Sequence, residues 1–230
     1  MLAEVLVIFI VAIGLLYVLR TRKQLELLAL QIRELRQHAL HRISYSPAGG
    51  ELAEDLAAAT AEANDLGFTI LGDYIEESPV RTTPTPMRWF VDARGTTFGW
   101  MAPFEVRGER TIVLVLMSHE LATQTITSRA PAASSLTRPP FVAIHHVPTT
   151  ASFADTVTKH RQFARLDDDT RGFVPVHTFD QLRHELERMR AKAIAWRETQ
   201  PSDELLEADL RSLLGKQYGK LAGAMRRRLA

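Results

Sequence analysis

The chain has 230 residues, of which 46% are hydrophobic and 24% are charged, and its 28 basic residues nearly balance its 27 acidic ones. This balance argues against nucleic-acid binding, because proteins that bind nucleic acids usually carry a strong basic excess. The chain contains no cysteine, which excludes disulfides and thiolate catalysis and agrees with a cytoplasmic domain.

The N-terminal segment is dominated by an uncharged apolar run, residues 5–19, which is followed by Arg20, Arg22 and Lys23. Together with residues 2–4 it approaches the roughly 20 residues that a helix needs to cross about 30 Å of hydrocarbon. We therefore expect residues 1–20 to form a single-pass transmembrane anchor, with residues 2–19 in the lipid bilayer.

The charges that flank this run predict an orientation. The nearby basic residues all follow the run, which predicts a cytoplasmic C-terminal domain on a protein of the inner (plasma) membrane. Two alternatives remain. A cleaved signal peptide would need basic residues before the run and a small-residue cleavage site after it. A core helix would usually carry a polar face.

Residues 21–43 contain no glycine or proline and are rich in helix formers, so residues 21–46 are expected to form a helical stalk. The stalk has about two heptads of apolar a/d spacing, fewer than coiled coils usually show, at Leu25, Leu28, Ile32, Leu35 and Ala39. Two interpretations stay open. The spacing is either a homodimer seam or the face of a helix that packs on its own domain.

The next segment, residues 47–200, is expected to form a cytoplasmic α+β domain. A helix is expected over 51–66, and helices with Ser152 and Thr178 as caps over 152–166 and 179–199. Between them, apolar and alternating patterns predict strands at 68–75, 87–91, 97–102, 111–117, 122–128 and 141–147. Short connections favour an antiparallel sheet of five or six strands with helices on one face. The continuous apolar run at 111–117 indicates a central strand covered on both faces.

The C-terminal segment, residues 201–230, is predicted to be a basic helix. From Lys216 onward it has five basic residues and no acidic one, and it ends in Arg226, Arg227 and Arg228. With Arg20, Arg22 and Lys23, these arginines could form a membrane-surface site on anionic lipid. Alternatively, they are solvated cations that suit the C-terminal end of a helix dipole.

Two partial metal motifs fail on chemical grounds. His119 and Glu120 begin an HExxH pattern, but position 123 is threonine and the segment is strand-like. Asp167, Asp169 and Gly172 match an EF-hand loop, but Arg171 and Thr178 replace oxygen ligands that calcium needs. We interpret residues 167–172 as a solvated acidic loop.

Three histidines are the remaining candidates for chemistry. His145 and His146 lie on the last strand and point to opposite faces, and His160 follows on the next helix. One strand histidine could meet His160 and a carboxylate such as Asp155 in a metal site or an acid–base pair. Alternatively, all three hydrogen-bond within the fold or face solvent. The chain has no phosphate-binding loop and no nucleophile elbow, so we predict neither a catalytic residue nor a cofactor.

Three segments, GFTILGDY, FVDARGTTFGWM and TITS, resemble a group of uncharacterised bacterial proteins. In that group an LGF-then-LGDY opening precedes a small antiparallel sheet, often behind one N-terminal membrane helix. The resemblance covers residues 60–165. It implies the architecture above and no activity, cofactor or catalytic residue.

These observations lead to three hypotheses. The first is a single-pass membrane protein whose cytoplasmic domain is an interaction or scaffold module. The second is a membrane-tethered small-molecule binder or hydrolase with a pocket near His145, His146 and His160. The third is a cell-envelope or division accessory protein that dimerises through residues 25–39. Histidines gathered around one cavity would favour the second hypothesis, and scattered histidines would favour the first.

Overall fold

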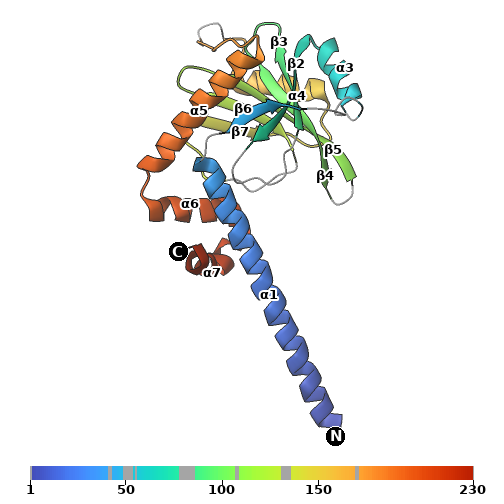
Figure 1. The fold of residues 1–230 in the computed structure, drawn as a ribbon, viewed down its shortest axis with the longest axis vertical. Helices are drawn as coiled ribbons and strands as arrows, with labels where there is room; N and C mark the ends of the chain where they lie inside the picture. The colour runs from blue at the N-terminus through green and yellow to red at the C-terminus, as the bar shows by residue number, and fades with distance from the viewer. Residues whose placement is uncertain are drawn as a thin grey trace. The chain divides into compact units, whose positions relative to one another are not determined.

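The computed structural model describes residues 2–40, 43–48, 54, 56–77, 86–106, 109–130, 136–168 and 171–229 (Figure 1). Within this set, only the backbone is described for residues 2–20, 106, 109 and 110. The chain forms two units. The helical unit comprises residues 1–40, 134–137 and 201–230, and the sheet unit comprises residues 41–133 and 138–200.

The helical unit contains α1 (Leu2–Leu40), α6 (Ser202–Leu214), the short helix η1 (Gly215–Gln217) and α7 (Tyr218–Leu229). Its apolar core is formed by buried residues from all three long helices, Ala29, Ile32, Leu210, Leu214 and Met225. The fully buried carboxylate of Asp209 ties this unit together. It accepts a hydrogen bond from the Thr137 backbone N–H at 2.9 Å and pairs with Arg36 at 3.3 Å.

Among the described residues, no helix combines the length and the apolar character that crossing a membrane requires. The uncharged run at residues 5–19 covers only about 22 Å of helix, less than the roughly 30 Å of a hydrocarbon core. Helix α1 then continues without a break through Arg20, Arg22 and Lys23. This finding contradicts the predicted transmembrane anchor, and with it the single-pass topology and the inner-membrane localisation.

The predicted stalk is helical over most of its length, but α1 ends at Leu40, and Ser44–Pro47 forms strand β1 instead. Leu25, Leu28 and Ile32 from the a/d pattern pack against α6 and α7 within the helical unit. The face of α1 that was expected to dimerise is therefore largely occupied within one chain. A homodimer through the stalk stays a prediction.

The sheet unit is built on one seven-stranded sheet whose strands follow in sequence order. The strands are β1 (Ser44–Pro47), β2 (Phe68–Glu77), β3 (Pro86–Asp92), β4 (Phe98–Val106), β5 (Glu109–His119), β6 (Gln124–Arg129) and β7 (Val142–His146). Neighbouring strands are antiparallel from β1 to β6, whereas β6 and β7 are parallel.

The prediction of a purely antiparallel sheet of five or six strands is therefore wrong, although the α+β class agrees with the structure. Strand β1 was missed because four residues ending in proline carry almost no periodic signal. The parallel pairing of β6 with β7 was missed because the sequence pattern of residues 130–141 predicts no helix, and a helix is the usual connection between parallel strands. The segment 130–141 is nevertheless long enough to return to the starting end of β6.

Helices cover both faces of the sheet rather than one. On one face, α3 (Ala57–Asp65) and α4 (Phe153–Ala164) pack through Leu56, Phe153 and Val157 onto Phe90, Met101, Leu114 and Leu116. On the other face, α5 (Phe179–Thr199) packs through Leu182 and Leu186 onto Trp89, Val91, Phe98 and Met117. Figure 1 shows α3 and α5 on opposite sides of the strands. The prediction that residues 111–117 form a central, doubly covered strand is confirmed: β5 pairs with β4 and β6, and its side chains enter the apolar cores on both faces.

A glycine in β4 is required by the close approach of β5. A Cβ atom on Gly99 would lie 2.1 Å from the carbonyl oxygen of Val115 and 3.1 Å from Cζ of Phe90. Atoms cannot approach this closely, so the two strands would have to separate. Gly99 therefore permits the tight pairing of β4 with β5 at the centre of the sheet.

We expect Gly99→Ala to lower the free energy of unfolding of the sheet unit by about 1–3 kcal/mol, as overpacking of a core typically does. Urea unfolding followed by tryptophan fluorescence reports on this unit, because Trp89, Trp100 and Trp196 all belong to it. Gly172→Ala is the control, since a Cβ there meets nothing within 4 Å. Equal unfolding midpoints for the two variants would contradict the steric argument.

Candidate functional site

The three candidate histidines do not meet in one cavity. His160 is fully buried on α4, whereas the ring of His145 stacks on Phe163, with 4.0 Å between ring centroids and 9° between planes. His146 is exposed at the end of β7. The structure thus places His145 beside α4 but does not assemble the predicted metal site or acid–base pair from these side chains.

His160 holds α4 to the sheet. Its Nε2 lies 2.9 Å from the Ser118 hydroxyl, and its Nδ1 lies 2.9 Å from the Thr127 hydroxyl. The Ser118 hydroxyl donates to the Thr96 carbonyl oxygen at 2.7 Å, so it accepts from Nε2–H and leaves Nδ1 to accept from Thr127. Burial, with a smaller effect of His145, lowers the pKa of His160 to about 3. Ser118 is also buried and its proton is already engaged, so this serine–histidine contact has a structural role.

A second buried network fixes the turn between β5 and β6. His119 Nδ1 lies 3.1 Å from Glu185 on α5, and Glu185 in turn accepts two hydrogen bonds from Arg188, at 2.8 and 2.5 Å. Burial raises the pKa of Glu185, but the hydrogen bonds from Arg188 and His119 outweigh this and hold it at about 2. Burial lowers the pKa of His119 despite the nearby carboxylate.

The same helix α5 also binds the backbone of this turn. Arg188 donates to the carbonyl oxygens of Glu120 and Leu121, at 3.2 and 3.0 Å, and Lys192 donates to that of Ala122 at 2.6 Å. Three successive carbonyl groups are therefore satisfied by cations from α5. The turn, which contains the partial HExxH motif, is held in a fixed position at the edge of a pocket.

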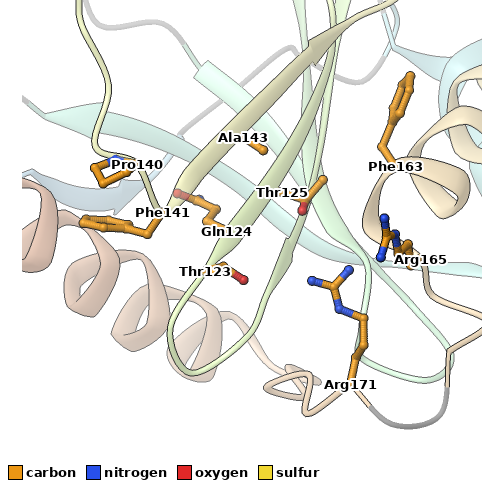
Figure 2. A pocket seen from close by; sticks show the side chains of 9 residues that line it. All are labelled: Thr123, Gln124, Thr125, Pro140, Phe141, Ala143, Phe163, Arg165 and Arg171. Carbon is orange, nitrogen blue, oxygen red and sulfur yellow. The ribbon is translucent and has the colours of Figure 1, made fainter.

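This pocket has a volume of about 290 Å³ and lies where the turn, the starts of β6 and β7 and the C-terminal end of α4 meet (Figure 2). Its lining combines hydroxyl, aromatic and guanidinium groups, from Thr123, Gln124, Thr125, Pro140, Phe141, Ala143, Phe163, Arg165 and Arg171. No acidic side chain lines it.

Two arginines give the pocket its charge. Arg165 ends α4 in the left-handed conformation, with φ of 53°, and its exposed side chain has no hydrogen bond or ion pair with any described residue. Arg171 donates to the Ala164 carbonyl oxygen at 3.0 Å and pairs with Glu120. Figure 2 shows both guanidinium groups turned toward the same opening. Among the described residues, Glu120 is the acidic side chain that pairs with one of these arginines, and it does not line the pocket, so the lining itself is positively charged.

Sequence reasoning missed this pocket, although two signals were present. The chain has no acidic residue between Glu120 and Asp155, the stretch that supplies six of the nine lining residues. Arg171, which ruled out calcium binding by the loop at residues 167–172, is itself a lining residue. Asp169 of that loop lies outside the described residues. Elsewhere in the described part of the chain, no three histidine or acidic side chains gather in a group able to hold a metal ion.

The predicted membrane-surface arginines are partly engaged in the helical unit. Arg226 pairs with Glu207 at 2.7 Å and donates to the Tyr218 hydroxyl at 3.0 Å. Arg22 pairs with Glu26, and Arg228 donates to the Ala224 carbonyl oxygen at 3.3 Å. Lys23 and Arg227 are exposed, and the side chain of Arg20 lies outside the described part of the structure.

No family model, no curated protein and no solved structure matches this chain significantly. The resemblance over residues 60–165 therefore stays a prediction, and the function must be argued from the geometry.

The burial of His160 predicts a pH dependence of stability. Between about pH 6.5 and about pH 3 the unfolded chain binds a proton on this histidine that the native chain does not. The stabilisation is fully present above about pH 6.5 and is lost as the pH falls. The slope approaches about 1.4 kcal/mol per pH unit.

We expect His160→Gln to be less stable than the unmodified chain at pH 7 and to lose less stability on acidification to pH 4.5. Urea unfolding of both proteins at several pH values measures this. Because His119 and the other groups titrate in both proteins, the difference between the two curves isolates His160. Parallel curves would show that His160 does not contribute the predicted dependence.

Proposed function

We propose that this chain is a binding protein whose sheet unit holds a small anionic ligand that also carries an apolar or aromatic group. The observation that carries the proposal is the pair Arg165 and Arg171, both lining a pocket that has no acidic lining residue. The scattered histidines count against a pocket near them and favour the interaction module, so this proposal keeps a small-molecule site only because a different pocket lies at the end of α4.

The chemistry of the lining supports such a ligand. Guanidinium groups bind carboxylates and phosphates through paired hydrogen bonds, and the hydroxyls of Thr123 and Thr125 can donate to the same oxygens. Phe141 and Phe163 offer apolar walls, and pockets of about 300 Å³ or more are typical of small-molecule sites. His145 stacks on Phe163 and supports that ring.

A second candidate function, an interaction or scaffold module, is favoured by Leu121. This side chain is 77% exposed at the tip of a turn whose backbone is held by Arg188 and Lys192. A rigidly presented apolar side chain can anchor a partner protein, since anchors of this kind dominate many interfaces. Leu121→Ser separates the two functions, because it would weaken partner binding and leave binding in the pocket unchanged.

We expect the 230-residue chain to bind benzoate or phenyl phosphate in the pocket, and Arg165→Gln to weaken the binding by up to about fivefold, the upper end for an exposed charge pair. Titration followed by ¹H–¹⁵N NMR gives the dissociation constants and locates the site through the amides of residues 123–125. Arg171→Gln should weaken binding to a similar extent.

Arg161→Gln is the matched control, because Arg161 is an exposed arginine on the same helix that does not line the pocket. Its variant should bind both probes as the unmodified chain does. Equal losses in the Arg161 and Arg165 variants, or shifts spread over the surface without involving residues 123–125, would contradict the proposal.

A further inference from the structure

Two polar groups of the pocket are already occupied by a carboxylate of the protein itself. Glu120 Oε1 is buried and forms an ion pair with Nε of Arg171 without accepting a hydrogen bond from any described residue, whereas its Oε2 accepts a hydrogen bond from the Thr123 hydroxyl at 2.6 Å. Arg171 and Thr123 line the pocket, whereas Glu120 does not. The Glu120 carboxylate therefore engages two lining groups that an incoming anion would use.

The backbone of Glu120 is firmly held, whereas its side chain is partly exposed. Its N–H donates to the Thr123 carbonyl oxygen at 2.9 Å, its carbonyl accepts from Arg188, and it forms an isolated antiparallel bridge with Phe173. The side chains of Glu120 and Arg171 are 19% and 26% exposed. Rotation of the Glu120 side chain alone can thus release Arg171 and Thr123, without movement of the turn.

The contacts of Glu120 with Arg171 and Thr123 also indicate which kind of anionic ligand the pocket would bind. The two oxygens of one planar carboxylate divide between the guanidinium of Arg171 and the hydroxyl of Thr123. A ligand carboxylate presents the same two oxygens and the same single charge. A phosphate brings more oxygens and up to twice the charge, so the Glu120 carboxylate beside Arg171 would repel it more strongly than a carboxylate ligand.

We propose that Glu120 is an internal competitor in this site, and that the ligand is a carboxylate that takes its place on Arg171 and Thr123. The inference rests on the proposed function and adds the ligand class and a mechanism of regulation. Arg165, which has no competing partner among the described residues, makes the first contact with the ligand. The ligand carboxylate then exchanges with that of Glu120, whose side chain turns toward solvent.

The test compares benzoate and phenyl phosphate binding to the 230-residue chain and to Glu120→Gln, by the same NMR titration. Removing the competing charge should tighten benzoate binding by about fivefold, the worth of a partly exposed ion pair. It should also reduce the preference for benzoate over phenyl phosphate. Glu105→Gln is the matched control, because it removes the same charge at an exposed position on β4 and should leave both affinities unchanged.

A second measurement does not depend on a variant. In the unmodified chain, saturation with benzoate should shift the side-chain carboxyl ¹³C resonance of Glu120, because that carboxylate loses both partners. A resonance that stays in place while benzoate binds would overturn the exchange.

The outcomes separate this inference from the proposed function. If the unmodified chain binds benzoate but Glu120→Gln binds it equally or more weakly, then Glu120 positions Arg171 and the competitor inference fails alone. If neither probe binds to the unmodified chain or to Glu120→Gln, both proposals fail. Tighter binding of phenyl phosphate than of benzoate by the unmodified chain would reject the carboxylate class.

Discussion

The ion pair between Glu185 and Arg188 on α5 is the interaction on which the β5–β6 end of the sheet depends. Glu185 is largely buried, and a buried carboxylate is stable only when charged and hydrogen-bonded partners surround it. Arg188 supplies two hydrogen bonds and His119 a third contact, and Arg188 then reaches the carbonyl groups of Glu120 and Leu121. One arginine thus links the buried charge of a helix to the backbone of a turn. Removing it would leave the carboxylate of Glu185 without its main partner and would destabilise this end of the sheet.

The position of the β5–β6 turn sets part of the lining of the pocket. The turn carries Thr123 into the lining and Glu120 behind it, while the parallel pairing of β6 with β7 brings Phe141 and Ala143 alongside. Helix α4 completes the site with Phe163 and with Arg165 at its end, and Arg171 adds a guanidinium that pairs with Glu120. Residues from the turn, β7, the end of α4 and the position of Arg171 therefore supply one positively charged pocket. In the proposed exchange, the Glu120 side chain is the group that moves, while the turn that carries it stays in place.

Features that depend on neighbouring residues, such as helix caps and the burial of single strands, could be predicted from the sequence. Ser152 and Thr178 were recognised as caps, and both form complete capping boxes. The apolar run at residues 111–117 indicated a doubly covered strand, and β5 is one. Features that depend on long-range pairing were missed. β1 exists because it pairs with β2, and the direction of β7 is set by how residues 130–141 return. The apolar run at residues 5–19 shows the same limit, because its composition predicted an anchor that the helix found in the structure does not support.

The path of the chain through its two units has a consequence for folding. After β6 the chain leaves the sheet unit, contributes Thr137 to the helical unit and returns to form β7, and the helical unit itself joins residues from both ends of the sequence. Bringing the two ends of the sequence together in the helical unit closes a long loop, and this costs conformational entropy. Contacts within the helical unit offset that cost only after the loop has closed. We expect strands β2 to β6, which pair with sequence neighbours, to form early. The helical unit and β7 would follow together, so the cavity that depends on β7 would be among the last parts of the molecule to become native.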